Sequence, residues 1–285
     1  MKICRFQSTQ DEVRIGLVKD DSSLVDLTPA GIRELQSLLE DGQAVSRLKQ
    51  IDQSGLPRLA LSEVRLCAPV EKQEVWAAGV TYLRSKTARM EESEFSATAY
   101  DRVYEAARPE LFFKSVAEKV VADGQPVGIR RDSRWSVPEP ELALVINSQG
   151  RVAGYTIGND MSSRDIEGEN LLYLPQAKIY RGSCALGPWL QLGASEETAR
   201  EWKISLEITR KGERVFAGET SVSQIKRRFE ELANFLFRSQ SFPHGAVLLT
   251  GTGVVPPDSF TLQEKDVVEI QISGIGLLKN DVMLV

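Results

Sequence analysis

The sequence contains one histidine, His244, among 285 residues. Histidine is the side chain that most often acts as a general base in enzymes, so this role is open to it at a single position. His244 lies between Pro243 and Gly245 and directly precedes the apolar segment AVLLTG. This setting is more typical of a loop residue before a strand than of a catalytic group.

Cysteines and long apolar runs are also scarce, and basic residues do not outnumber acidic ones. The three cysteines are widely spaced, which indicates neither a disulfide framework nor a zinc site. No apolar run approaches the ~20 residues that span a bilayer, and the start, MKICRFQ, lacks the apolar core of a signal peptide. The net charge of -5 gives no basic patch for nucleic acid or anionic membrane. We therefore expect a cytoplasmic protein that binds neither.

The first part of the chain predicts a small α+β domain. Short apolar segments indicate strands at residues 2–7, 13–18 and 23–27. Leucines and a valine at helical spacing indicate one helix over residues 30–48. The following segment is loop-like up to Pro69, so we expect a domain boundary there, between residues 1–69 and a larger domain of residues 70–285.

The larger domain is predicted to be rich in strands. VSQIKRRFEELANFLF (222–237) is the clearest amphipathic helix, and WKISLEITRKGERVFAGETS is typical of a hairpin that turns at Lys211-Gly212. Strands do not alternate regularly with helices, which argues against a TIM barrel or a Rossmann sheet. TGTG is not followed by a helix, so it is weak evidence for dinucleotide binding. The composition of elements predicts the α+β class.

One hairpin carries three acidic residues. ELALVI is typical of a strand, NSQG of a turn, and RVAGYTIGND of the returning strand. With the turn at NSQG, the expected register pairs Ile146 with Arg151, Glu141 with Thr156, and Glu139 with Gly158. Side chains alternate between faces, so Glu139, Glu141 and Asp160 are expected on one face. A bulge in the hairpin would change this count.

Three crowded carboxylates repel one another, so either one takes up a proton or a cation neutralises them. The set contains no histidine or cysteine. Oxygen ligands alone favour Mg²⁺, Mn²⁺ or Ca²⁺ over zinc. The pattern is equally compatible with Glu139 and Glu141 forming a solvated strand edge.

Five motifs in order give the segment from about Val75 to Val285 a resemblance to a known family. They are PEPELALVI, GYTIGNDMSSRD, LPQAKIYRGSCALGPW, TGTG and GIGLLKNDV, and together they resemble the fumarylacetoacetate hydrolase superfamily. The resemblance implies a metal-dependent enzyme acting on 2-oxo acids. It also implies a large mixed β-sheet rolled into a sandwich, in a homodimer or homotetramer.

The resemblance assigns roles to single residues. It implies that Glu139, Glu141 and Asp160 bind the metal, which we expect to be Mg²⁺. Lys178 matches the active-site lysine. For the substrate, it implies a contact of Thr252 with the carboxylate and a polar contact at Gln176.

One segment departs from the hydrolytic members, which carry a His–Glu pair that activates water. Here the segment reads GVTYLRSKTA, with Ser85 and Ala88 at those two positions. The longer segment GVTYLRSKTARMEES, followed by YDRVYEAARPELFFK, is similar to the dehydratase branch that acts on 2-keto-3-deoxy sugar acids. That resemblance implies that Glu110 and Lys178 flank the substrate. We expect Lys178 to be the base at C3 and Glu110 to be the acid for the leaving C4 hydroxyl. Three further residues, Arg84, Ser85 and Lys114, are candidates for holding the substrate.

Other functions stay open at this point. The same scaffold could support an acylpyruvate-type hydrolase, an oxaloacetate-type decarboxylase or a tautomerase. It could also be a catalytically silent metal-binding protein. Lys178 could simply pair with an acid, and Glu110 could be an ordinary acid at the start of a strand.

Overall fold

The computed structural model describes residues 1–8, 12–20, 22–83 and 102–285. The three N-terminal strands are confirmed, as β1 (Lys2–Gln7), β2 (Val13–Asp20) and β3 (Ser23–Asp26). The prediction of one helix over residues 30–48 is wrong. The segment forms η1 (Thr28–Ala30), α1 (Gln36–Leu39) and α2 (Ala44–Asp52). Gly42 lies in the break, where the Asp41 carboxylate accepts a hydrogen bond from the backbone N–H of Gln43 and offers the chain a turn in place of a helix.

An 11-stranded sheet forms the centre of the described structure, with ten of its strands in the order β4-β3-β2-β1-β13-β11-β10-β16-β6-β7 and β5 paired to β1. It is mixed, because β16 and β6 run parallel whereas β10 and β11 run antiparallel. The strands not yet defined are β4 (Arg58–Ala60), β5 (Arg65–Cys67), β6 (Glu74–Gly79), β7 (Glu110–Ser115), β10 (Pro140–Ile146), β11 (Val152–Asp160), β13 (Cys184–Leu192) and β16 (Ala246–Thr252).

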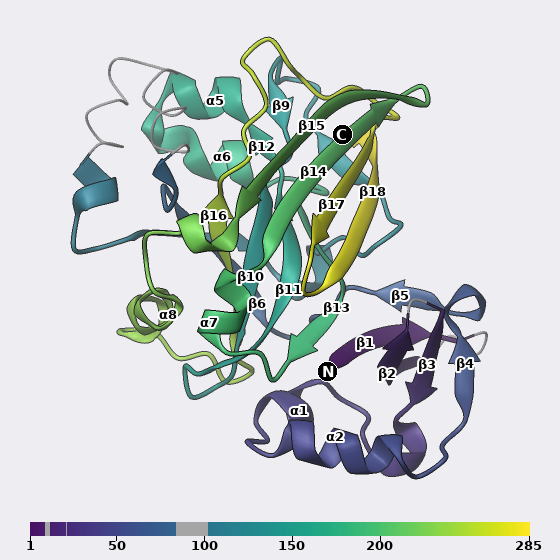
Figure 1. Ribbon diagram of the computed structural model, residues 1–285. Helices are drawn as coiled ribbons and strands as arrows, with labels where there is room; N and C mark the ends of the chain where they lie inside the picture. Colours follow the sequence, from purple (N-terminus) through teal and green to yellow (C-terminus); the bar gives the residue numbers. More distant parts are fainter. Residues whose placement is uncertain (9–11, 21, 84–101) are drawn as a thin grey trace.

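A five-stranded sheet packs across the large one, in the order β15-β14-β17-β18-β8 (Figure 1). Its strands are β8 (Val127–Ile129), β14 (Lys203–Arg210), β15 (Glu213–Ser221), β17 (Val267–Ile272) and β18 (Gly276–Leu284). One apolar cluster joins Leu144 and Ile157 of the large sheet to Ile204 and Ile270 of this one. The predicted strand-rich α+β sandwich with a large mixed sheet is therefore confirmed, and so is the hairpin that turns at Lys211-Gly212.

Few helices complete the described structure. Among them are α5 (Arg164–Glu169), α6 (Leu174–Lys178), α7 (Glu196–Arg200) and α8 (Phe229–Phe237), with short 3₁₀ turns at η2 (Leu61–Glu63), η3 (Ala117–Lys119), η4 (Leu171–Tyr173) and η5 (Val222–Gln224). β9 (Ser136–Val137) and β12 (Ser162–Ser163) form a separate two-stranded pair. No helix in the described ranges is long and apolar enough to cross a membrane.

The amphipathic helix predicted over 222–237 is shorter than expected, because α8 begins at Phe229. The guanidinium of Arg200 donates to the backbone carbonyls of Ile225 and Arg227. These carbonyls therefore accept hydrogen bonds from a side chain in place of the backbone bonds of a helix. Ile225 and Arg228 have extended backbone angles.

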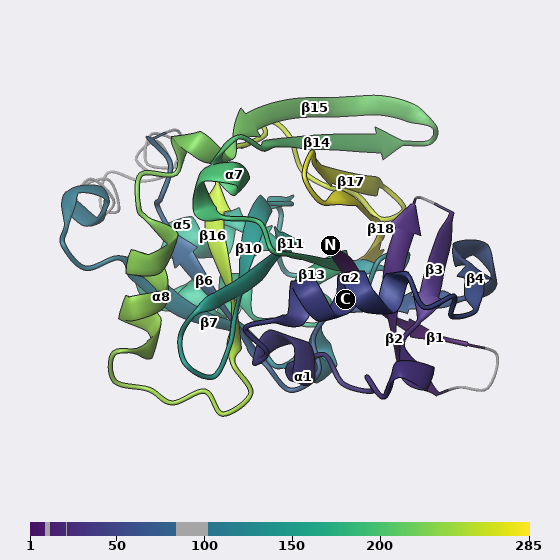
Figure 2. The same cartoon turned by 60° about the horizontal axis from the view of Figure 1, so that its bottom comes forward.

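The N-terminal strands continue the large sheet, because β1 pairs with β13. Figure 2 shows α1 and α2 on one side of this region. The domain boundary near Pro69 stays a prediction.

Candidate metal centre

The acidic hairpin forms with a register that differs from the predicted one. Glu141 lies opposite Gly158, and Ala143 takes the place opposite Thr156. At the turn Ile146 pairs with Val152, one residue beyond the predicted Arg151, and a bulge next to Ile146 adds a second residue to the shift. The predicted pairing is therefore wrong by two residues along the part of the hairpin that carries the acids.

A shift of two residues leaves every side chain on its predicted face. The backbone N–H of Asp160 donates to the carbonyl of Glu139 at 3.0 Å, so these two acids are neighbours across the strands. Oxygen atoms of Glu139, Glu141 and Asp160 all lie within 4.8 Å of one another. The convergence predicted from the sequence is confirmed, and this group could hold a metal ion.

All three acids are buried: Glu139 is 3% exposed, and Glu141 and Asp160 are each 1% exposed. This burial excludes the solvated strand edge that the sequence left open. Buried charges need a partner, because the protein interior does not solvate them. The all-oxygen donor set fits a hard divalent cation.

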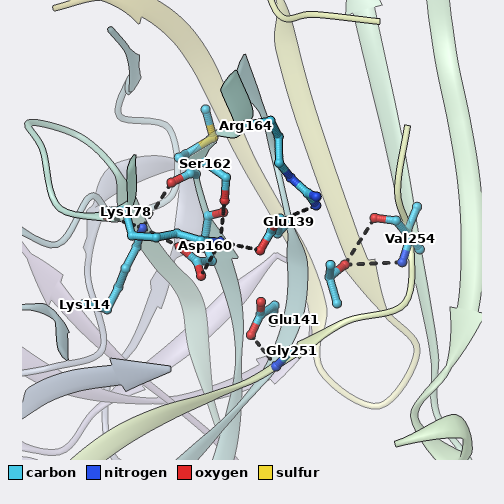
Figure 3. Close-up of polar contacts among 11 residues, drawn as sticks. Lys114, Glu139, Glu141, Asp160, Ser162, Arg164, Lys178, Gly251 and Val254 are labelled. Atoms are coloured by element: carbon cyan, nitrogen blue, oxygen red, sulfur yellow. Dashed lines mark hydrogen bonds and ion pairs between the residues drawn. The ribbon is translucent and has the colours of Figure 1, made fainter. Parts of the chain in front are cut away.

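Lys178 lies against this cluster from the C-terminal end of α6, and its side chain is 1% exposed. Its Nζ donates to Glu139 Oε2 at 2.7 Å, to Asp160 Oδ2 at 3.1 Å and to Ser162 Oγ at 2.6 Å (Figure 3). The ring centroid of Phe112 lies 5.8 Å from the same nitrogen. The lysine thus reaches two of the three acids.

Arg164 and Ser162 were not predicted as site residues. Arg164 opens α5 and is 2% exposed, and its Nη2 donates to Glu139 Oε1 at 2.7 Å. Glu139 is therefore held from both sides, by Arg164 through one oxygen and by Lys178 through the other (Figure 3). Ser162 and Arg164 both lie in the segment SSRD (162–165), shortly after Asp160, and this segment was the signal available in the sequence.

Glu141 accepts a hydrogen bond from β16, the strand beside it. The backbone N–H of Gly251 donates to Glu141 Oε2 at 2.6 Å. Burial, followed by the negative charges of Asp160 and Glu139, raises the pKa of Glu141 well above its ordinary value. The charged form is thus disfavoured in the protein alone, and a bound cation would favour it.

Thr252 is the residue after Gly251 and lies opposite Glu141 in the sheet. Its Oγ1 accepts from the backbone N–H of Val254 at 3.2 Å and lies at the same distance from the Val254 carbonyl. The threonine is 4% exposed, so it lies beside the carboxylate cluster and not at the surface.

Glu110, the first residue of β7, lies opposite Gly79. Phe112 shares its face of the strand and packs in the same apolar cluster as Ala143. Ala143 lies two residues after Glu141 on β10. Glu110 is therefore on the face of the sheet that carries the acids.

The remaining predicted residues are placed as follows. Lys114 is fully buried and forms an ion pair with Asp160. The side chain of Gln176 is exposed on α6, and its backbone carbonyl accepts from Arg130 at 3.1 Å. Arg84 and Ser85 lie outside the described residues. His244 is in the loop before β16, as predicted, and its Nδ1 lies 2.9 Å from Gln36 Oε1.

Comparison with known proteins gives consistent results. The family model described as fumarylacetoacetate (FAA) hydrolase C-terminal matches residues 74–283. A probable 2-keto-3-deoxyxylonate dehydratase of Haloferax volcanii is 48% identical over 217 residues, which cover 76% of this chain and 74% of that protein. The 2-dehydro-3-deoxy-D-arabinonate dehydratase of Saccharolobus solfataricus is 38% identical, over 92% of this chain and 89% of that protein.

A solved structure of 2-keto-3-deoxy-D-arabinonate dehydratase complexed with magnesium and 2,5-dioxopentanoate is also similar. Its TM-score is 0.82 at 32% identity, and the match covers 100% of this chain and 99% of that one. The ordered motifs, the sandwich fold and these relatives agree. The chain belongs to the fumarylacetoacetate hydrolase family.

Proposed function

We propose that this protein is a Mg²⁺-dependent dehydratase of a 2-keto-3-deoxy sugar acid, with a 2-keto-3-deoxypentonate giving 2,5-dioxopentanoate and water. The observation that carries the proposal is the buried cluster of Glu139, Glu141 and Asp160 with Lys178 against it. The two dehydratase relatives and the magnesium-bound structure give the substrate class.

Glu139, Glu141 and Asp160 would hold the cation. Bound there, Mg²⁺ would supply Lewis-acid polarisation of the 2-oxo group. We propose that Thr252, Gln176, Arg84 and Ser85 contact the substrate, as the family resemblance implies. Assembly as a homodimer or homotetramer also stays a proposal.

The acid–base work falls to Lys178 and Glu110. Lys178 accepts the proton from C3, and Glu110 donates a proton to the C4 hydroxyl, which leaves as water. The C3–H and C4–O bonds break and a double bond forms between C3 and C4. The unsaturated product then isomerises to 2,5-dioxopentanoate. Each of these residues is expected to contribute about 10²–10⁴-fold in rate.

A panel of 2-oxo acids tests this proposal. The purified protein is incubated with Mg²⁺ and one candidate substrate at a time. The candidates are 2-keto-3-deoxypentonates of both C4 configurations, an acylpyruvate and oxaloacetate. We expect a semialdehyde product from at least one pentonate, detected with an aldehyde reagent, and no cleavage of the acylpyruvate. Turnover of acylpyruvate or oxaloacetate without dehydration would assign another reaction of the same scaffold.

Metal removal should abolish turnover. Dialysis against EDTA is expected to lower the dehydration rate by at least about 10²-fold, because the metal is the Lewis acid of the reaction. Adding Mg²⁺ back should restore the rate, and titrations with Mn²⁺ and Ca²⁺ rank the alternatives. Full activity in the dialysed protein, with no metal detected by elemental analysis, would contradict the metal assignment.

Gly79 gives a test of Glu110 that leaves Glu110 itself in place. A Cβ at this position would lie 2.0 Å from Glu110 Oε2, so Gly79→Ala must move that carboxylate. We expect kcat to fall about 10²-fold with little change in Tm, because the atom displaced is the end of a flexible side chain. Gly42→Ala is the matched control, since a Cβ there meets nothing within 4 Å. Unchanged kcat in Gly79→Ala would argue against Glu110 as the acid.

A further inference from the structure

Lys114 lies on β7, an edge strand of the large sheet in the described part of the chain. On β6, Val75 pairs with Ser115 and Trp76 pairs with Phe113. Lys114 is therefore the extra residue of a β-bulge, which redirects a side chain locally. Its side chain is 0% exposed, which is rare for lysine.

The ammonium of Lys114 contacts three protein groups. It forms an ion pair with the Asp160 carboxylate and donates to the backbone carbonyls of Met161, at 3.1 Å, and of Lys178. The two carbonyls thus take two of the three ammonium donors, and the carboxylate of Asp160 balances the buried charge. A contact between Lys114 and the substrate would compete with the ion pair to Asp160.

Each acceptor belongs to the proposed machinery or adjoins it. Asp160 is a proposed metal ligand, Met161 is the next residue, and Lys178 is the proposed base. Figure 3 shows Lys114 and Lys178 both reaching toward Asp160. One buried ammonium thus joins the backbone of the base to the metal ligand.

The strand that carries Lys114 also carries the proposed acid. Glu110 is four residues earlier on β7, and between them the ring of Phe112 lies 5.8 Å from Lys178 Nζ. β7 is hydrogen-bonded on its β6 side, so Lys114 supplies a second attachment, to the segments that carry Asp160 and Lys178. The placement of Glu110 relative to Lys178 therefore depends on it.

We propose that Lys114 is a positioning residue: it fixes the strand of the acid, Glu110, against the base, Lys178, and the metal ligand Asp160. This inference rests on the proposed dehydratase function. A displacement of about 1 Å between reacting groups can cost about 10²-fold in rate. The loss of Lys114 is therefore expected to act on kcat.

The test is Lys114→Met, assayed on the best pentonate of the panel at saturating Mg²⁺. We expect kcat per folded site to fall about 10²-fold, while KM stays within about threefold. The Kd for Mg²⁺, measured by calorimetry, is expected to change because Lys114 contacts the proposed ligand Asp160, so each variant is assayed at its own saturating Mg²⁺. Lys119→Met is the matched control, because Lys119 is exposed on η3. Lys114→Gln, which keeps two donors, serves if the methionine variant does not fold.

Other roles for Lys114 would change different measured quantities in the Lys114→Met variant. A raised KM at unchanged kcat would assign Lys114 to substrate binding and overturn the proposal. A lower Tm at unchanged kcat per folded site would make it a purely structural residue, which also overturns it.

A crystal structure of the variant tests the proposal without any activity, and so separates it from the proposed function. Displacement of β7 relative to Asp160 and Lys178 is expected, and an unmoved strand would overturn the proposal. If the unmodified protein dehydrates none of the pentonates, the proposed function fails, and this structure still decides the role of Lys114.

Discussion

Replacing Lys178 with methionine is expected to lower kcat for dehydration by about 10²–10⁴-fold, because the variant has no group to accept the C3 proton. Methionine fills a similar volume, so the fold should be kept. The measurement is the dehydration rate at saturating Mg²⁺, together with incorporation of solvent deuterium at C3, followed by NMR. Both should fall together, since both begin with removal of the C3 proton.

The same variant should depend on metal for its stability more strongly than the unmodified protein does. Lys178 donates to Glu139 and Asp160, and without it these buried carboxylates lose a cationic partner. Without metal, Tm is expected to fall, and Mg²⁺ should recover it. A ligand at 100 times its Kd stabilises the folded state by about 2.7 kcal/mol. Lys119→Met is again the control, and dehydration within a few-fold of the unmodified rate would exclude Lys178 as the base.

The sequence contained enough to predict the acidic cluster, although its register was wrong. Side chains in a strand repeat every two residues, so an error of two leaves Glu139, Glu141 and Asp160 on one face. The bulge beside Ile146 was not predictable, because it depends on how the turn meets the flanking strands. The face was thus a safer prediction than the pairing.

Contacts between distant segments account for what was missed. Arg164 meets Glu139 only because the chain turns from β11 into α5, and no spacing in the sequence gives that turn. The helix predicted to start at residue 222 starts later, because Arg200 takes the carbonyls of Ile225 and Arg227. Lys114 was predicted near the substrate, and its ion pair with Asp160 and its two hydrogen bonds to backbone carbonyls are visible only in the structure.

Replacing Glu141 with glutamine should lower activity without lowering Tm in the absence of metal. Lys178→Met, in contrast, should lower both. Glutamine keeps the shape of the side chain and an oxygen that can accept from the Gly251 N–H. It removes a charge that burial and the neighbouring acids already disfavour. We therefore expect Tm without metal to be kept or raised.

Metal binding and turnover should both fall in this variant, because the cluster loses one of its three negative charges. Loss of an outer contact to a metal ligand typically costs 10–100-fold in affinity, so loss of a ligand should cost about 10²-fold or more. The measurements are Mg²⁺ titration by calorimetry, the Mg²⁺-induced rise in Tm, and the dehydration rate. Glu213→Gln, at an exposed position on β15, is the matched control.

The pH dependence of unfolding without metal gives an independent check. Because the pKa of Glu141 is raised in the folded state, the folded chain binds more protons than the unfolded chain above the ordinary value of 4.5. The free energy of unfolding should therefore fall as pH rises from 4.5 toward the raised pKa, and Glu141→Gln should remove this contribution. A variant that binds Mg²⁺ as tightly as the unmodified protein, or that loses several degrees of Tm without metal, would show that Glu141 is a structural residue and not a ligand.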